Sequence, residues 1–456
     1  MSAAGASERA RAETIAGLVL DTARAGGAEQ AAVRLSLGRF IDISWRDGQM
    51  EKASASATRS LTLRLLVKGR YGVHSTSDLR PGALKEFVRR AVELTRALQP
   101  DPLRALPSPD AYPSGPAPDL GLYDPAAARS STGQWIALAR EIQAAAAEAG
   151  VRTGYKVVST QGGAYMELGE GLLVTSNGFS GWQRQTNCYA GAAVTLDDPH
   201  IPGGKRSGWW WEGERALAPM TDPSRLRRIS TTAAYRAARQ IGAKPGPGGR
   251  MAVVVENIAA GRLLEDLLGP MSGPALRLGR SYLKGLLGKQ MASRVLTMRD
   301  EPLIRGAVGS RWFDSEGVAA RAFTLVDAGK LRNYYLDTYH SRLLGLRRTT
   351  GSVSNLVVLP TEQGGMEQLA STMDEGIVVT SFLGGNFNST TGEFSYGISG
   401  LLVKGGRIVG PVEGMNLAGE FTGLWKALRA VGNDAYTYSS VRSPSLMFEG
   451  LRVSGV

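Results

Sequence analysis

The stretch VVTSFLGGNFNSTTGEFSYGISGLLVKGGRIVGPVEGMNLAGEF, residues 378–421, decides how the chain is expected to fold. It holds ten of the 58 glycines, and from Phe394 to Ile398 apolar side chains alternate with small or polar ones, the period of a half-buried strand. Gly405 and Gly406 predict a tight hairpin, because glycine reaches positive φ without steric cost. The stretch therefore predicts antiparallel β-structure.

A polar loop flanked by glycine interrupts this pattern. The residues that we expect to bind a substrate are Gly384, Gly385, Asn386, Asn388, Ser389 and Thr390. Such a loop could take a backbone or phosphate group, because it offers short donors and acceptors where glycine allows close approach. The alternative is an ordinary surface turn in which asparagine satisfies only its own backbone.

Size and composition are those of a globular protein. The 456 residues suffice for two or three domains, and 43% hydrophobic and 21% charged residues are ordinary values. No apolar run approaches the ~20 residues of a membrane-spanning helix, and the N-terminus has no apolar signal segment. The lone cysteine, Cys188, allows no intrachain disulfide, so a cytoplasmic location is the default expectation.

The net charge of +12 raises the question of nucleic acid. Lysine and arginine are scattered, however, and the chain has no basic tail, no zinc-finger spacing and no aromatic RNA-binding motif. We expect an arginine-rich surface rather than a nucleic-acid interface.

The fold class expected is α+β, with boundaries at two breaker segments. Residues 99–120 carry seven prolines, and residues 244–249 read KPGPGG; proline fixes φ and removes a donor, so neither helix nor central strand persists there. The expected parts are an N-terminal domain over 1–98 with antiparallel strands flanked by helices, a linker over 99–120, a central α+β region over 121–243, and a mainly β domain with a few helices over 250–456.

Local signals place several elements within these parts. Asp47-Gly48 and Lys68-Gly69 predict two hairpins, and Asp222-Pro223 predicts a helix start with an N-cap followed by proline. Trp209, Trp210 and Trp211 form a run that could anchor a partner or peptide, or be divided between core and surface.

Motifs for familiar catalytic sites are missing. The three histidines, His74, His200 and His340, have no metal-ligand spacing, and Cys188 has no local partner. Three histidines do not exclude a Ser-His-Asp catalytic triad, but the sequence has no G-x-S-x-G motif between a predicted strand and a predicted helix. No Walker A loop or dinucleotide fingerprint opens a helix.

Three stretches in order resemble the TldD/TldE (PmbA) family, formerly called modulators of DNA gyrase. They are DGQMEKASASATRSLTLRLLVKGRYGVHSTSDL at 47–79, the opening stretch from residue 380 on, and SPSLMFEGLRVSG at 443–455. In this family TldD-like members carry H-E-x-x-x-H on the first helix of the C-terminal domain and a late cysteine, and TldE-like members lack both. Here the stretch AGRLLEDLLGP puts Glu265 and Pro270 at the histidine positions, so the chain resembles the TldE/PmbA branch.

The resemblance implies a function for the chain. It would be a TldE-like subunit of a heterodimeric cytosolic metallopeptidase that processes or degrades small unfolded peptides. It would be non-catalytic alone and hold no cofactor, with zinc in a TldD-like paralogous subunit. Residues 383–394 would line the cleft that receives the peptide as an added strand. The alternative is a stand-alone binding protein that contacts nucleic acid through its basic surface.

Overall fold

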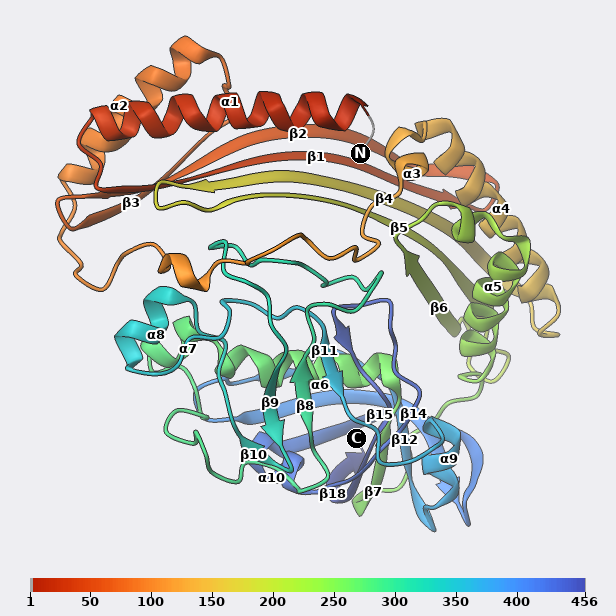
Figure 1. The fold of residues 1–456 in the computed structure, drawn as a ribbon. Coiled ribbons are helices and arrows are strands. Elements are labelled where there is room, and N and C mark those ends of the chain that lie inside the picture. Colours follow the sequence, from red (N-terminus) through yellow and green to blue (C-terminus); the bar gives the residue numbers. More distant parts are fainter. Residues whose placement is uncertain (1–2, 456) are drawn as a thin grey trace.

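The computed structural model describes residues 3–455; residues 1, 2 and 456, which the expected outer domains include, lie outside the described part. A long, curved, six-stranded antiparallel sheet forms the N-terminal half, in the order β3-β2-β1-β4-β5-β6 (Figure 1). Its strands are β1 (Gln30–Arg46), β2 (Gln49–Val67), β3 (Arg70–Thr76), β4 (Val157–Thr175), β5 (Ser180–Asp197) and β6 (Lys205–Glu214).

The sheet is continuous across the proline-rich stretch. β1 pairs with β4 without a break, from Ala32 opposite Thr175 to Arg46 opposite Gln161. The N-terminal and central regions therefore share one sheet, although residues 99–120 separate them in the chain. The division into domains that the sequence suggests stays a prediction.

The expected hairpins join these strands. Asp47 and Gly48 have φ of 49° and 80°, and Lys68 and Gly69 have φ of 50° and 69°. Positive φ at both central residues is typical of the type I′ turn, whose twist fits the right-handed twist of the two strands that it joins.

Helices cover the convex face of the sheet (Figure 1). They are α1 (Ala3–Ala25), α2 (Pro81–Arg96), α3 (Pro125–Arg129), α4 (Thr132–Val151) and α5 (Pro223–Ala238). Val33 and Leu35 of β1 pack under α1 and α2, and Ile41 and Ile43 of the same strand pack under α4 and α5. Odd-numbered residues of β1 therefore all point to one face of the sheet, where one end of the strand packs against α1 and α2 and the other end packs against α4 and α5.

The cap predicted for α5 is present. The Asp222 side chain accepts a hydrogen bond from Ser224 N, and Pro223 opens the helix. α5 lies very close to β6, because a Cβ on Gly208 would come within 2.3 Å of Ala233 O and Ala237 N.

The proline-rich stretch passes between the sheet and the C-terminal half (Figure 1). Leu106 N donates to the Gln30 side chain on the sheet side. On the other side Ala319 N donates to Ala111 O and Gly306 N to Leu120 O. The stretch therefore lies between the two halves and is hydrogen-bonded to both of them.

The C-terminal half contains the strands of the opening stretch in a sheet that closes on itself. β12 (Glu375–Phe382) pairs with β7 (Gly249–Val255), β7 with β18 (Leu446–Gly455), β18 with β15 (Arg407–Glu420), β15 with β14 (Glu393–Lys404), and β14 with β12. Each of the five strands is thereby paired on both sides over part of its length.

Shorter elements surround this barrel. β13 (Asn386–Phe387) and β16 (Leu428–Val431) join its strands, and a second sheet has the order β10-β9-β8-β11-β17. That sheet comprises β8 (Met298–Asp300), β9 (Phe323–Asp327), β10 (Lys330–Leu331), β11 (Leu356–Val358) and β17 (Val441–Arg442). The helices are α6 (Asn257–Leu268), α7 (Gly273–Arg277), α8 (Thr338–Leu344), α9 (Met366–Ser371) and α10 (Phe421–Lys426), with 3-10 turns at Pro109–Ala111, Ala218–Thr221 and Gly269–Met271.

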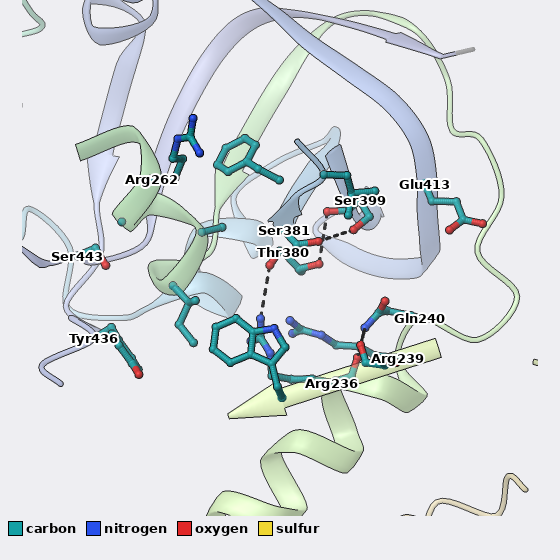
Figure 2. Close-up of a pocket in the computed structure, with 18 of the residues that line it drawn as sticks. Arg236, Arg239, Gln240, Arg262, Thr380, Ser381, Ser399, Glu413, Tyr436 and Ser443 are labelled. Atoms are coloured by element: carbon teal, nitrogen blue, oxygen red, sulfur yellow. Dashed lines mark hydrogen bonds between the residues drawn. The ribbon is translucent and has the colours of Figure 1, made fainter. Parts of the chain in front are cut away.

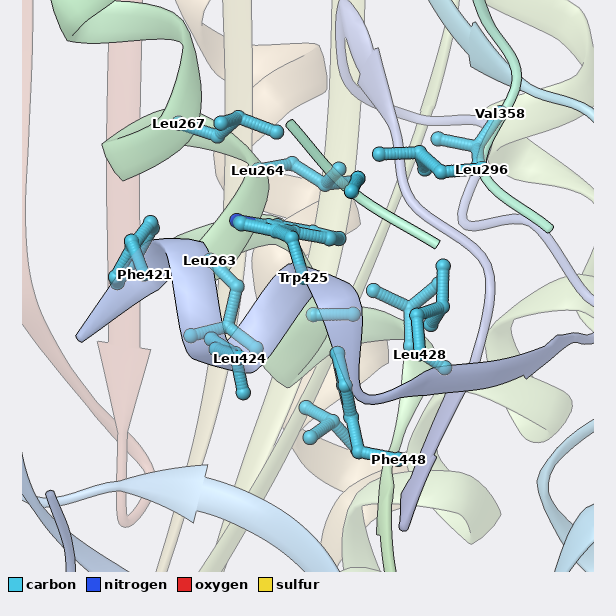
Figure 3. Close-up of a cluster of buried hydrophobic side chains, with 14 of the residues drawn as sticks. Leu263, Leu264, Leu267, Leu296, Val358, Phe421, Leu424, Trp425, Leu428 and Phe448 are labelled. Atoms are coloured by element: carbon cyan, nitrogen blue, oxygen red, sulfur yellow. The ribbon is translucent and has the colours of Figure 1, made fainter. Parts of the chain in front are cut away.

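Trp425 of α10 lies at the centre of the largest core, packed with leucines of α6 (Figure 3). One face of α6 is thereby buried, through Leu263, Leu264 and Leu267, and the other is left to face the cleft described below. The α+β expectation is confirmed, with antiparallel strands in the N-terminal part and more strands in the C-terminal part. No helix in residues 3–455 is long and apolar enough to cross a membrane.

Candidate functional site

A cleft of about 760 Å³ opens where β6 and α5 meet the C-terminal barrel (Figure 2). Its lining comes from β6 (Lys205, Arg206, Ser207, Gly208, Trp209), the end of α5 and the residues after it (Arg236, Arg239, Gln240), α6 (Ile258, Ala259, Gly261, Arg262, Glu265), the end of β12 and the residue after it (Thr380, Ser381, Phe382, Leu383), and Ser399, Glu413, Tyr436, Ser439, Val441 and Ser443. The cleft therefore lies between the two halves of the molecule.

β6 is an edge strand, and its open side faces this cleft. Asp198 N donates to Gly204 O, which continues the hydrogen-bond pattern between β5 and β6. In this pattern the main-chain N–H and C=O groups of even-numbered β6 residues bond to β5, and those of odd-numbered residues point away from it. The carbonyls of odd-numbered residues accordingly receive bonds from outside the sheet: Ser207 O from Gln240 Nε2 at 2.9 Å and Trp211 O from Tyr436 OH at 2.8 Å. Trp209 lies between Ser207 and Trp211, and its main-chain N–H and C=O groups also point away from β5, toward the cleft.

A second strand end contributes to the lining opposite β6. β7 pairs with β12 only as far as Val379, so the rest of β12 has β14 on one side and the cleft on the other. Arg236 Nη2 donates to Thr380 O across the gap at 3.4 Å. Ser381 and Ser399 share a hydrogen bond of 2.6 Å on the same wall (Figure 2).

The arginines of the cleft are held by carboxylates of the protein itself. Glu256 is 6% exposed and accepts bonds from Arg236 Nη1 at 2.8 Å and from Arg239 Nη2 at 2.9 Å. These contacts join the end of α5 to the residue before α6. They also neutralise part of the positive charge of the wall.

Arg206 is held in the same way. Its Nε donates to Asp198 at 2.7 Å, and its Nη atoms donate to Glu413. Burial would raise the pKa of Asp198, but the bonds from Arg206 and from the main-chain N–H groups of Gly242 and His200 outweigh it and hold that pKa below its usual value.

Arg262 is the remaining arginine of the lining, and it belongs to α6. It pairs with Asp266 at 2.6 Å, and the same carboxylate accepts a bond from Tyr396 OH. Burial, with the bond to Asp266, raises the pKa of Tyr396, so this hydroxyl stays protonated and donates. The Asp266 carboxylate thus fixes both Arg262 and Tyr396.

The structure brings only part of the predicted substrate segment to this cleft. Leu383 lines it, but Gly384, Gly385, Asn386, Asn388, Ser389 and Thr390 do not. Asn388 Oδ1 accepts from Thr390 N at 2.9 Å, which is a bond within its own turn. Asn386 belongs to β13 and pairs with Ser395. A substrate role for this loop stays a prediction.

The two positions compared with a zinc motif have different surroundings. Glu265 lies in the cleft lining, whereas Pro270 is buried in the 3-10 turn after α6. Proline offers no donor atom to a metal, so this pair does not fit a zinc site. Within residues 3–455 no group of three or more His, Cys, Asp or Glu is placed to hold a metal ion.

The tryptophan run is divided between different roles. Trp209 is 46% exposed and lines the cleft. Trp210 packs against the core under α4 and α5, and the ring of Trp211 fills the space above Gly191. Sequence reasoning found the run, but it missed the open main chain of Trp209, because strand order in a sheet leaves no local signal.

Comparison with known proteins identifies the family. Models of the PmbA/TldA metallopeptidase match residues 31–95 as domain 1, 127–243 as the central domain and 248–455 as the C-terminal domain. The chain belongs to the PmbA/TldD family. The resemblance noted in the sequence is therefore confirmed.

Relatives match over nearly the whole length. Metalloprotease PmbA of Escherichia coli O157:H7 is 26% identical over 434 residues, which cover 94% of this chain and 93% of that protein. A crystal structure from Bacteroides thetaiotaomicron, named as a modulator of DNA gyrase, has a TM-score of 0.90 and 33% identity, covering 97% of this chain and 99% of that one. TldE of Thermococcus kodakarensis shares the fold, with a TM-score of 0.81, 19% identity, and 96% and 100% of the chains covered. The PmbA/TldD family thus includes TldD and TldE members.

Proposed function

We propose that this chain is a TldE/PmbA-like subunit of a cytosolic metallopeptidase. It holds no zinc and presents small unfolded peptides to a TldD-like paralogous subunit that does. Membership of the PmbA/TldD family supports the peptidase class. The absence of any histidine between His200 and His340, where TldD-like members carry H-E-x-x-x-H, supports the non-catalytic role.

The open edge of β6 in the cleft carries the proposal. A peptidase that accepts varied unfolded chains must bind what all of them share, which is the main chain. An extended peptide laid beside Trp209 can exchange two main-chain hydrogen bonds with it, in the manner of an added strand. The exposed indole of Trp209 lies beside the same path.

The internal pairing of charges in the cleft favours tolerance of sequence. Four arginines of the cleft each bond to a carboxylate of the chain: Arg206, Arg236, Arg239 and Arg262. Because their positive charges are balanced in this way, the cleft does not select peptides with acidic side chains. Each backbone bond contributes only about 0.5–1.5 kcal/mol net, so binding by this chain alone should be weak. The partner subunit would supply further contacts.

A proline at position 209 tests the peptide-binding edge. Trp209→Pro removes a donor that faces the cleft and leaves the β5 ladder intact, because edge strands accept proline where the N–H faces away from the sheet. The control, Trp209→Val, also removes the indole but keeps the N–H. We expect the proline variant to bind a fluorescent unstructured peptide several-fold more weakly than the valine variant, by anisotropy. Equal affinities of the two variants would contradict backbone capture at β6.

Two further measurements test the subunit role. Co-expression with a TldD-like protein should give a stable complex that hydrolyses the peptide, and this chain purified alone should not hydrolyse it. Metal analysis should find zinc in the complex and less than stoichiometric zinc in the isolated chain. One tightly held zinc per isolated chain would exclude the non-catalytic role.

A further inference from the structure

A second cavity, of about 750 Å³, opens where the proline-rich stretch meets the small sheet of the C-terminal half. Its walls come from the 3-10 turn Pro109–Ala111, from the paired strands β8 and β9 (Figure 1), and from the loops at residues 302–322 and 347–350. Small-molecule sites of proteins have volumes of about 300–1,000 Å³. The cavity shares no lining residue with the cleft beside β6, so what it binds is independent of the proposed function.

The lining of this cavity is rich in arginine, through Arg299, Arg311, Arg321, Arg347 and Arg348. Of these five, only Arg299 forms an ion pair within residues 3–455, with Glu301 at 3.0 Å. Arg321 and Arg347 are exposed, and Arg348 is half-buried. In the cleft beside β6, by contrast, each of the four arginines bonds to a carboxylate. The second cavity therefore holds positive charge that the described chain leaves unpaired.

Arg311 is held in the wall by uncharged oxygen atoms. Its Nη1 atom donates to Val353 O at 3.1 Å, and its Nη2 atom donates to Thr350 Oγ1 at 3.3 Å. Its Nε atom is buried and has no acceptor in the described part of the chain. The guanidinium is thus fixed in position while its charge is unpaired. A group that is fixed in this way loses little conformational freedom when an anion binds.

Two of the three aspartates in the lining are buried and already bonded. Asp300 is 1% exposed and accepts bonds from Tyr335 OH at 2.9 Å and from Ser354 N at 2.8 Å. Asp314 is 5% exposed and accepts a bond from Thr350 Oγ1 at 3.2 Å. These carboxylates are therefore used by hydrogen bonds within the wall and form no ion pair with the exposed arginines.

Asp110 is the exposed aspartate of the lining. The hydrogen bond from Ser108 and, to a smaller extent, the charge of Arg348 lower the pKa of Asp110, so this carboxyl group is ionised at neutral pH. Its single negative charge is outnumbered by the four lining arginines that have no ion pair in the described residues. This surplus of positive charge favours a ligand that carries at least two negative charges.

We propose that this cavity binds a small organic compound with two or more phosphate charges, of the size of a nucleoside diphosphate. A guanidinium presents paired N–H donors that match two oxygens of a phosphate, and a diphosphate concentrates several charges within the reach of a few arginines. The uncharged part of the ligand packs against the small and apolar residues of the lining, which are Pro302, Val318, Ala319, Ala320, Ala322 and Phe323.

Isothermal titration calorimetry of the full chain with ADP and with pyrophosphate tests the proposal. Each should bind at a single site per chain, and added salt should weaken both, because salt screens the charges of the arginines. Adenosine, which lacks the phosphates, should not bind detectably, and citrate, which offers only carboxylates, should bind several-fold more weakly than ADP. A chain that does not bind ADP, or that binds citrate as tightly as ADP, would overturn the proposal.

Two matched double variants locate the site. Arg347→Ala combined with Arg348→Ala should weaken ADP binding by about tenfold or more, since two charge-assisted contacts are lost, with circular dichroism unchanged. The control, Arg407→Ala combined with Arg452→Ala, removes the same charge from exposed positions outside the cavity and should leave the affinity unchanged. Equal losses in both would show unspecific attraction to a basic protein, and an oligonucleotide that displaces ADP better than pyrophosphate does would show a nucleic-acid surface; either result overturns the proposal.

Discussion

Replacing Glu256 by glutamine should destabilise the protein strongly, because this carboxylate joins the two halves. Glu256 is 6% exposed and accepts bonds from Arg236 and Arg239, whose side chains are 9% and 8% exposed. Glutamine keeps the shape but leaves two buried guanidinium groups without a counter-charge. Breaking a buried ion pair by removing one partner costs about 3–5 kcal/mol. Because the glutamine carbonyl can keep one bond, we expect a loss at the lower end of that range.

The assay is urea unfolding followed by circular dichroism, with Glu265→Gln as the control. Glu265 lies on α6, the helix that follows Glu256, but it is exposed and is not among the residues bonded to arginine. Its replacement should change the free energy of unfolding by less than about 0.5 kcal/mol. If the two variants unfold at the same urea concentration, the contact between α5 and Glu256 does not hold the halves together.

Three further predictions concern the core and the packing of helices. Gly208→Ala should cost about 1–3 kcal/mol by pushing α5 from β6, whereas Gly410→Ala, with no atom near the added Cβ, should be neutral; urea midpoints distinguish them. Trp425→Ala should cost about 3–5 kcal/mol and Trp425→Phe much less, because the buried indole N–H has no partner in the described chain to lose; calorimetry would show the order, and equal losses would contradict it. Burial raises the pKa of the Cys188 thiol to about 12 from 9.0, so the unfolded chain loses this proton first. Stability should therefore fall from pH 9 to 12 by more in the wild type than in Cys188→Ala, and a thiol reagent at pH 8 should react only after unfolding.

Local structure was predictable where one or two residues decide it. Asp47-Gly48 and Lys68-Gly69 form the expected turns, since the required positive φ is cheap for glycine. Asp222 and Pro223 open α5, because cap and φ are both local properties. These predictions depend on neighbours in the chain and are independent of how the sheets are ordered.

The candidate site was not predictable in the same way. Trp209 lines a cleft only because β6 is the last strand of its sheet and the barrel ends opposite to it. The pairing of Arg206 with Glu413 joins residues 207 positions apart, and no spacing rule reports it. At Asn388 the bond to Thr390 N agrees with the ordinary turn that was the alternative from the start.

The pairing of β1 with β4 has a consequence for synthesis of the chain. Ala31 N donates to the Ser176 side chain, 145 residues later. At ~5–20 residues per second a ribosome takes about 7–30 s to make that segment. During this time β1, complete and paired with β2, presents its other side without a partner, and this interval is when we expect the nascent chain to need chaperones most.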